Sequence, residues 1–339
     1  MHWFHGDKFK MVRIGCLGAA KITPTSLIAP VRARNDIEIT AIAARDLVRA
    51  SKFAETHSIR GVETDYGRLI ERNDVDMIYN ALPPHRHEDL TILALKAGKP
   101  VLCEKPIALN AAAAQRMADV ADETGTVLME AFHYRFHPAF QQMKDIVCGG
   151  DLGRLRTLKA HFSVEVPDSE TELRHLFELG GGALMDLGCY PVHWARTLLD
   201  GEAEIVSASA QTGRDQIDLT MEAELIFDGG VRAHIRTSMA RGAERAAGLK
   251  VEGSDASLIM QNPIAPHRGY RTEIHGAGDP IVVADAPEGG PTTYDYQLGH
   301  FLDCITQGAP PILTPSDGVA NMVAIDAIYE KAGLKPRGT

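Results

Sequence analysis

Short apolar runs alternate with stretches of helical periodicity along the first 131 residues. Apolar runs bounded by Gly or Pro predict buried strands, and apolar residues three and four positions apart predict amphipathic helices. Strands are expected at Val12–Leu17, Ile37–Ala44, Val75–Ala81, Lys99–Cys103 and Val127–Ala131. Helices are expected after Pro24 and at Asp46–Ile59, Glu88–Lys96 and Asn110–Glu123. This alternation is typical of a parallel sheet with right-handed crossovers, so we predict a doubly wound α/β domain over residues 1–131, with residues 1–10 as a loose extension.

After Phe132 the pattern changes to longer β-like runs separated by Gly-rich turns such as Asp228-Gly229-Gly230. The runs cover Arg156–Val166, Glu204–Ala210, Leu219–Phe227, Val231–Ser238 and Leu249–Glu252. One helix is expected near residues 182–199 and a last one at residues 315–331, which could pack back on the first domain. We therefore predict a C-terminal α+β domain, residues 132–339, with a large, mostly antiparallel open sheet. Such a sheet would expose apolar surface on one face, which favours a homo-oligomer, a dimer or tetramer formed through it.

The composition mainly excludes some classes of partner and location. The chain has 35 basic and 45 acidic residues, a net charge of −10, which argues against nucleic acid or an anionic membrane as a partner and favours a small-molecule substrate. No apolar run approaches the roughly 20 residues of a membrane span, and residues 1–10 lack a signal-peptide pattern. Five cysteines, widely spaced and odd in number, indicate reduced thiols and a cytoplasmic protein.

The turn after the first strand has the spacing of a dinucleotide-binding turn. Gly18, Ala20 and Thr23 stand where such folds place glycines, although only the first is Gly. The helix that follows would present N–H groups to a phosphate. The turn therefore favours a Rossmann nucleotide site, with an ordinary strand-turn-helix as the alternative.

The end of the second strand indicates which nicotinamide cofactor is bound. An acidic residue there accepts a hydrogen bond from the ribose 2′-hydroxyl of NAD, and an Arg accommodates the 2′-phosphate of NADP. This chain has Arg45 at that place and Arg49 one helical turn later, which favours NADP over NAD. In the alternative reading Asp46 takes the acidic role and Arg45 is a solvated charge.

The segment Leu102-Cys103-Glu104-Lys105-Pro106 stands at the end of the fourth predicted strand. The carboxyl ends of strands line the ligand crevice of an open α/β sheet, so a Glu-Lys pair there is placed for chemistry. A Lys beside a bound ring can be tuned by burial and can lower the pKa of a neighbouring acid. An exposed loop is the alternative for such a common tripeptide.

A second group of chemical residues follows the run Gly180-Gly181-Gly182, which would leave room for a flat ligand. At about 100° per residue, Asp186, Tyr190 and His193 share one stripe of a helix. A Tyr and an Asp one turn apart can hold a hydroxyl-bearing substrate, with Tyr as acid or base. The alternative is that Tyr190 is a core aromatic residue and Asp186 a local cap.

Histidines gather in two places, His85 and His87 after the third predicted strand and His133 and His137 around Tyr134. No Asp, Glu or Cys nearby completes a metal site, so we expect pocket lining rather than a metal.

The chain resembles the Gfo/Idh/MocA oxidoreductases from Met11 onward, through "IGCLGAAKI", "AARDLVRASKFA", "PPHRHEDLTILALKAGKPVLCEKP", "MEAFHYRFHP" and "GGGALMDLGCY". It is similar to the branch of dimeric dihydrodiol dehydrogenases, NADP-dependent xylose dehydrogenases and glucose-fructose oxidoreductase, which carry Tyr where inositol dehydrogenases have His. The resemblance implies that Lys105 is the catalytic Lys, Asp186 a substrate-positioning acid and Tyr190 the proton-transfer residue. The family's usual aromatic residue or Met is replaced by His133.

The implied function is a hydride transfer between NADP and a sugar, polyol or related hydroxy or carbonyl compound, as in an aldose dehydrogenase. Dihydrodiol oxidation, or reduction of a dicarbonyl or anhydro-sugar, is the alternative reaction, and a non-catalytic NADP-binding sensor is the alternative outside enzymes. Substrate contacts are expected from Lys105, His133, Asp186, Tyr190 and His193. Cofactor contacts are expected from Gly18, Ala19, Ala20, Lys21, Ile22, Arg45, Arg49, Asn80, Leu82, Pro83, His85, His87, Glu104, Lys105 and Arg135.

Overall fold

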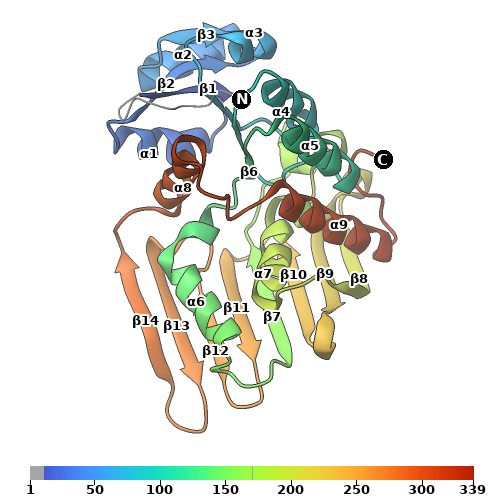
Figure 1. Cartoon of the computed structure of the whole chain (residues 1–339). Coiled ribbons are helices and arrows are strands. Elements are labelled where there is room, and N and C mark those ends of the chain that lie inside the picture. Colours follow the sequence, from blue (N-terminus) through green and yellow to red (C-terminus); the bar gives the residue numbers. More distant parts are fainter. Residues whose placement is uncertain (1–10, 170) are drawn as a thin grey trace. The chain divides into compact units, whose positions relative to one another are not determined.

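The computed structural model describes residues 11–169 and 171–339, which form two compact units (Figure 1). Unit 1 is described over residues 11–108, 112–131 and 294–318, and unit 2 contains residues 109–111, 132–293 except 170, and 319–339. The predicted loose extension, residues 1–10, lies outside the described residues. Helix α8 (Thr293–Gln307) belongs almost entirely to unit 1 although it follows the second sheet in the sequence.

Unit 1, as far as it is described, is built on a six-stranded parallel sheet in the order β3-β2-β1-β4-β5-β6. The strands are β1 (Val12–Leu17), β2 (Ile37–Ala43), β3 (Gly61–Glu63), β4 (Met77–Asn80), β5 (Val101–Cys103) and β6 (Leu128–Glu130). The helices between them are α1 (Ala29–Arg32), α2 (Leu47–His57), α3 (Tyr66–Glu71), α4 (His87–Lys96) and α5 (Ala111–Thr124). The strand order reverses between β1 and β4, where doubly wound folds bind ligands at the carboxyl ends of the strands. The predicted fold of this unit is confirmed.

Strand β3 and helix α3 were not predicted. Three residues at the edge of the sheet are too few to show a period of two. Gly61 is required there because a Cβ would lie 2.9 Å from the Thr40 carbonyl oxygen of the neighbouring strand. The short strand therefore contains a residue that sequence patterns associate with turns.

Unit 2, over its described residues, contains an eight-stranded sheet in the order β14-β13-β12-β11-β7-β10-β9-β8. The strands are β7 (Thr157–Ser163), β8 (Glu204–Thr212), β9 (Asp218–Ile226), β10 (Arg232–Ser238), β11 (Ala246–Glu252), β12 (Ser257–Gln261), β13 (Arg268–His275) and β14 (Ile281–Glu288). Neighbouring strands pair antiparallel except β7 and β10, which pair parallel. The predicted mostly antiparallel sheet is confirmed, and it extends beyond the predicted strands through β12, β13 and β14.

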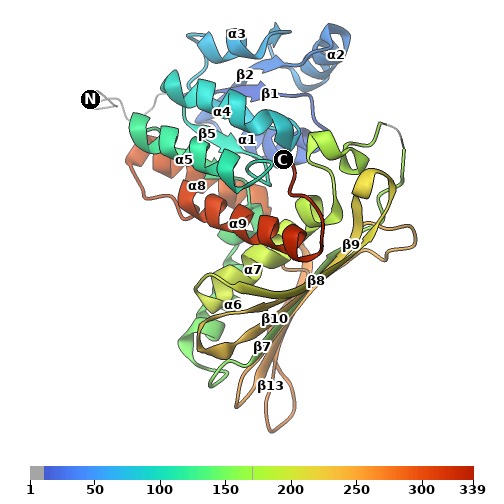
Figure 2. The ribbon, with the colours of Figure 1, turned by 90° about the vertical axis from the view of Figure 1, so that its right-hand side faces the viewer.

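Helices α6 (Pro138–Gly149) and α7 (Cys189–Leu199) lie on one side of this sheet, as Figure 2 shows. Leu158 and Ala160 of β7 and Ile235 of β10 point to that side and are buried. Lys159 and His161 alternate with them and are exposed on the other side. The outer face is therefore polar here, and the apolar surface that motivated the predicted oligomer is absent from this part of the described sheet.

The last helix, α9 (Pro315–Lys331), has the predicted bounds and leads to a buried arginine. The Arg337 guanidinium donates to the Gly181 carbonyl and to the Asp218 carboxylate, both at 2.6 Å. It lies against the rings of Tyr329 and Phe177, with centroids 4.2 and 4.6 Å away, and Arg337 and Asp218 are fully buried. The hydrogen bond to Gly181 ties the end of the chain to the loop before α7, and the ion pair with Asp218 ties it to the start of β9.

Replacing Arg337 with Met should lower the free energy of unfolding by about 3–5 kcal/mol, because it leaves a buried carboxylate without its counterion. Burial already raises the pKa of Asp218 to about 6 although Arg337 opposes that shift, so the variant's pKa rises further. A raised folded-state pKa makes stability fall as pH rises, so the loss should be larger at about pH 8 than at about pH 5. Urea unfolding measures it.

The matched control is Arg116→Met, which removes an exposed ion pair with Glu88 and should cost less than about 1 kcal/mol. Equal losses in the two variants would contradict the buried pair's role.

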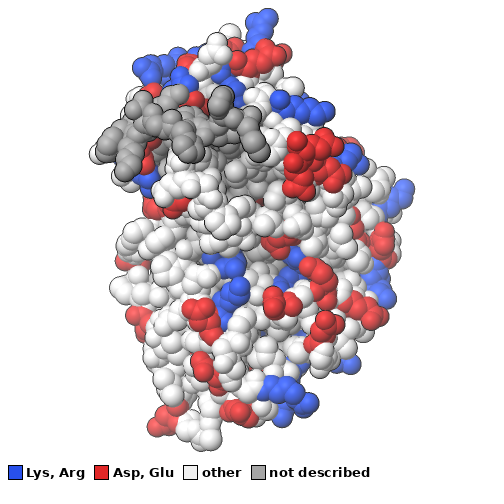
Figure 3. Space-filling model, in the orientation of Figure 1, with Lys and Arg blue, Asp and Glu red and all other residues white. Residues whose placement is uncertain are grey.

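Acidic and basic side chains are intermixed on the face shown in Figure 3. Within residues 11–169 and 171–339, no helix is both long and apolar enough to cross a membrane. The same described residues contain no group of three His, Cys, Asp or Glu side chains that could hold a metal ion.

Candidate active site

Gly18 makes the turn after β1 and fits the predicted phosphate loop. Its φ is +96°, and a Cβ would lie 3.0 Å from the Leu82 side chain, so both backbone conformation and space require Gly. Ala19 and Ala20 follow, then Lys21 and Ile22, which are exposed. Pro24 opens a π-helical turn, Pro24–Ile28, that continues into α1, and Pro suits the first turn of a helix. A compact turn before a helix start is what a dinucleotide pyrophosphate needs.

The residues after β2 favour Arg45 over Asp46 as the ribose-side contact. Asp46 is the N-cap of α2, and its carboxylate accepts a hydrogen bond from the Arg49 backbone N–H at 3.1 Å. Arg49 donates from its guanidinium to the Ala19 carbonyl at 2.7 Å, so it also supports the phosphate loop. Arg45 is exposed. Burial, with help from Arg86 and Arg45, lowers the pKa of His85.

The end of β4 is braced by buried polar side chains. Asn80 is fully buried and accepts from the Leu82 backbone N–H at 3.3 Å. His87 is also fully buried, with its ring nitrogens 2.6 Å from the Leu82 carbonyl and 3.0 Å from the Pro106 carbonyl. Burial lowers the pKa of His87 to about 4, although the hydrogen bonds to the Leu82 and Pro106 carbonyl groups oppose that shift. Any effect of His87 on a cofactor therefore passes through the backbones around Pro83 and Pro106.

Glu104 and Lys105 follow β5 directly, and Lys105 is half-buried. Tyr79 of β4 donates from its hydroxyl to Glu104 at 2.5 Å, and its oxygen lies 2.7 Å from the Ser26 hydroxyl. Burial and the Glu104 charge raise the pKa of Tyr79 well above its usual value, so Tyr79 stays protonated as the donor. The Ser26–Tyr79–Glu104 chain fixes the backbone on which Lys105 stands.

In unit 2, Asp186 lies in a π-helical turn, Leu184–Gly188, that precedes α7. Tyr190 follows in α7, so the segment predicted as one helix consists of a π-helical turn and an α-helix. The Asp186 carboxylate accepts from the Arg174 guanidinium at 2.6 Å, and Arg174 also donates to Glu172 at 2.9 Å. Asp186 is therefore held as an oriented, charged acceptor.

The glycine run does not leave room for a flat ligand, contrary to prediction. A Cβ on Gly181 would lie 2.7 Å from the Arg174 carbonyl oxygen. A Cβ on Gly182, whose φ is +131°, would lie 2.2 Å from Asp218. The chain itself fills the space beside both glycines.

Tyr190 is buried among aromatic rings, with the centroids of Phe132 and Phe162 at 5.3 and 5.7 Å in edge-on contacts. Its hydroxyl lies 3.4 Å from Nε2 of His133, a residue predicted to contact substrate. Tyr190 is thus a core aromatic residue, as one sequence interpretation expected. It also has a hydrogen-bonded neighbour that can exchange a proton with it, as the other interpretation requires.

His193 and Arg135 are buried, and each contacts neighbouring aromatic side chains. Nδ1 of His193 is hydrogen-bonded to the Tyr134 hydroxyl, and its ring stacks on Phe132 at 4.4 Å. The Arg135 guanidinium lies over the Phe140 ring at 5.7 Å. His193 orients Tyr134 within the aromatic group around Tyr190, and Arg135 packs on α6.

Sequence reasoning missed four partners that organise these groups. Nothing in the sequence distinguishes Ser26 or Tyr79 from ordinary helix and strand residues. Arg174 stands 12 residues before Asp186, too far to be read as a pair. Thr293, which contacts His133 from 160 residues away, has no local signal at all.

Two family profiles match the chain. The profile described as the oxidoreductase family with an NAD-binding Rossmann fold covers residues 12–132, and the GFO/IDH/MocA C-terminal domain covers residues 140–259. The chain belongs to the Gfo/Idh/MocA family of oxidoreductases, and the predicted resemblance is confirmed.

Similar proteins act on different substrates. The NADP-dependent D-xylose 1-dehydrogenase 2 of Haloferax volcanii is 31% identical over 94% of this chain and 96% of its own. The trans-1,2-dihydrobenzene-1,2-diol dehydrogenase of Xenopus tropicalis is 29% identical over 88% and 91%. A solved 3-ketoreductase from Actinomadura kijaniata, in complex with NADP and TDP-benzene, superimposes with a TM-score of 0.86 at 29% identity, covering 95% and 98%.

Proposed function

We propose that this chain is an NADP-dependent oxidoreductase that transfers a hydride between the cofactor and a hydroxyl or carbonyl carbon of a sugar, polyol or related compound. The observation that carries the proposal is the position of Lys105 at the carboxyl end of β5, in the same sheet as the Gly18 turn. Family membership supports the oxidoreductase class, and the named relatives support NADP and sugar-like substrates.

Three residues of the chain have separate roles in the proposed reaction. In the oxidation direction Tyr190 accepts the proton of the reacting hydroxyl. Lys105 keeps its positive charge and stabilises the negative charge that develops on the substrate oxygen. Asp186, oriented by Arg174, accepts a hydrogen bond from the substrate and so fixes its position. The bound cofactor supplies the nicotinamide carbon that takes up or gives the hydride.

We expect Arg45→Asp to reverse the cofactor preference from NADP to NAD. Arg45 can form charge-assisted bonds to a 2′-phosphate, each contributing roughly 1.5–3 kcal/mol, or more than tenfold in affinity. An Asp repels the phosphate and accepts from a free 2′-hydroxyl. Fluorescence titration with NADPH and NADH measures both affinities.

The control for this change is Arg60→Asp, an exposed arginine of the same unit paired with Glu38, which should leave the preference unchanged. Tighter binding of NADH than NADPH by the wild-type protein would contradict the role of Arg45 and return the ribose contact to Asp46.

The specific substrate is resolved by assay in both directions. Aldose oxidation is the main candidate, with dihydrodiol oxidation and dicarbonyl or anhydro-sugar reduction as the alternative supported by the diol dehydrogenase relative. Aldoses, inositols and diols with NADP⁺, and dicarbonyls with NADPH, form the panel. An aldose-only profile supports the first reading, and a diol or dicarbonyl profile supports the second.

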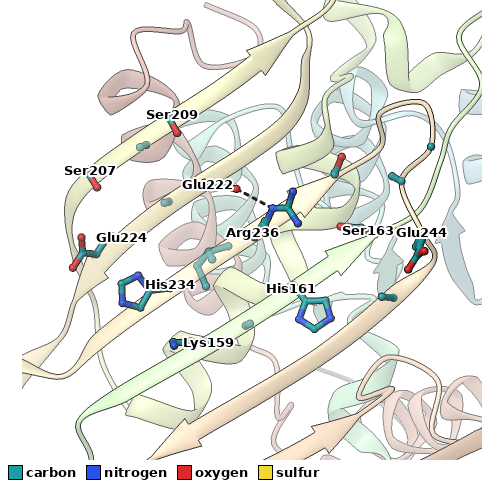
Figure 4. Close-up of a pocket in the computed structure, with 18 residues that line it drawn as sticks. Lys159, His161, Ser163, Ser207, Ser209, Glu222, Glu224, His234, Arg236 and Glu244 are labelled. Atoms are coloured by element: carbon teal, nitrogen blue, oxygen red, sulfur yellow. Dashed lines mark hydrogen bonds and ion pairs between the residues drawn. The ribbon is translucent and has the colours of Figure 1, made fainter.

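We also propose that two copies meet through the outer face of the unit 2 sheet. Figure 4 shows a groove there with Lys159 and His161 of β7 and Arg236 of β10, and Glu222 of β9 bonded to Arg236 at 2.8 Å. Charges of both signs on neighbouring strands suit a two-fold, self-complementary contact. Light scattering should give a dimer that Arg236→Glu converts to a monomer, while Arg116→Glu does not; a monomeric wild type would refute the contact.

The cytoplasm is the proposed location. All five cysteines lie in the described residues as free thiols, which suits a reducing compartment. Cell fractionation tests this, and recovery of the protein outside the cytoplasm would refute it.

A further inference from the structure

We propose that Tyr190 passes the substrate proton to water through a relay of His133, Thr293 and His267. The inference rests on the proposed role of Tyr190 as the proton acceptor. It concerns the route by which that proton leaves a buried side chain, and it gives His133 a task that its position in the sequence did not suggest.

The four side chains form a continuous chain within unit 2. The Tyr190 hydroxyl lies 3.4 Å from Nε2 of His133. Nδ1 of His133 lies 2.7 Å from the Thr293 hydroxyl, and that hydroxyl lies 3.5 Å from Nδ1 of His267. The first and last links are long, as catalytic hydrogen bonds often are before substrate binds.

A backbone N–H identifies the acceptor at the outer end of the relay. The Thr293 N–H donates to Nδ1 of His267 at 3.3 Å, so this nitrogen is the unprotonated one. In the relay that we propose, the Thr293 hydroxyl donates to the same nitrogen and accepts from Nδ1–H of His133. Nε2 of His133 is left as the acceptor for the Tyr190 hydroxyl. All donors therefore point from Tyr190 toward His267.

The relay is needed because Tyr190 is buried and cannot release a proton to water directly. Tyr190 is 5% exposed, His133 4% and Thr293 0%, so the first three members are shielded from water. His267, in the segment between β12 and β13, is partly exposed and can exchange protons with solvent. A proton delivered to Tyr190 thus has a path outward along groups that already hold the required polarity.

The proton balance closes over one oxidation. The substrate O–H bond breaks and its proton joins the Tyr190 oxygen, while Tyr190 releases its own proton to Nε2 of His133. His133 gives the Nδ1 proton to Thr293, Thr293 gives its hydroxyl proton to Nδ1 of His267, and the His267 ring releases one proton from Nε2 to water. The hydride leaves separately with the cofactor, so one proton is produced per turnover. His133 is then protonated on Nε2 and His267 on Nδ1, and both rings return to their starting tautomers before the next turnover.

The kinetic test compares two substitutions that each interrupt the relay. Thr293→Val keeps the backbone N–H and the side-chain size, and should lower kcat roughly tenfold or more with KM unchanged. Thr293→Ser, which restores the hydroxyl, should recover the rate. His133→Ala should lose rate similarly and regain it with added imidazole, which fits the space left by the ring, whereas imidazole should not rescue Thr293→Val because His133 still occupies that space.

A second readout needs neither cofactor nor substrate. Nitrogen NMR of histidine-labelled wild-type protein, assigned with the single variants, reports the tautomer of each ring. We expect the proton on Nδ1 in His133 and on Nε2 in His267. The opposite tautomer at His267 would overturn the relay even if the variants fold poorly.

The two proposals fail in different ways. If Tyr190→Phe keeps full activity, the proposed function of Tyr190 is wrong. If Tyr190→Phe is inactive but Thr293→Val turns over like the wild type, Tyr190 retains its role and the relay is refuted.

Discussion

Lys105→Met should lower turnover by about 10²–10⁴-fold while leaving NADP binding nearly unchanged. That range is typical for removal of an acid-base or electrostatic group from an active site. Lys105 stands at the end of β5, on a backbone fixed by the hydrogen bond from Tyr79 to Glu104. The proposed adenine-side contacts, Arg45 and Arg49, follow β2 and are untouched. Steady-state kinetics and fluorescence titration measure the two quantities.

Lys96→Met is the matched control, because Lys96 is an exposed residue in the last turn of α4. It should retain the wild-type rate. A Lys105→Met enzyme with a rate near that of the wild type would remove Lys105 from the mechanism.

Tyr190→Phe should reduce the rate by a similar factor with little effect on folding. The Phe ring keeps the edge-on contacts with Phe132 and Phe162, and the change removes the hydroxyl with its hydrogen bond to His133. The wild-type rate of oxidation should rise with pH because the reaction releases a proton by way of Tyr190, and the variant should lose this dependence. The pH profile of kcat/KM and a thermal unfolding curve provide the measurements.

Tyr66→Phe removes the hydroxyl of another buried tyrosine, in unit 1, and should leave the pH profile unchanged. If Tyr190→Phe keeps both its rate and the wild-type pH profile, the proton acceptor is a different group, and His193 is the first candidate.

The sequence predicted the elements whose residues carry strong local patterns. Strand β1 has the predicted bounds because a continuous apolar run is followed directly by Gly18. Helix α9 also has the predicted bounds, with Pro315 at its start. Strand β13 was missed because charged residues such as Arg271 and Glu273 interrupt its apolar pattern, and its register comes from pairing with β12 and β14. Such a strand depends on neighbours that a local pattern does not contain.

The site shows the same division between local and long-range information. Gly18 and Arg45 were predicted as cofactor contacts because a tight turn and a strand end have local rules. The partners of Glu104 and Asp186 were not, because Tyr79 and Arg174 reach them only after folding. The π-helical turn at Leu184–Gly188 was not predicted either, because the sequence projection assumed regular helical spacing.

The most direct test of the proposed activity is the appearance of reduced nicotinamide absorbance with NADP⁺ and the panel of aldoses, inositols and diols, and its loss with NADPH and dicarbonyls. We expect at least one substrate to support turnover by the wild-type protein, and Lys105→Met to bind NADPH as tightly while losing nearly all of that turnover. Tight NADPH binding with no turnover in either direction would contradict an enzymatic role and identify the protein as a cofactor-binding sensor.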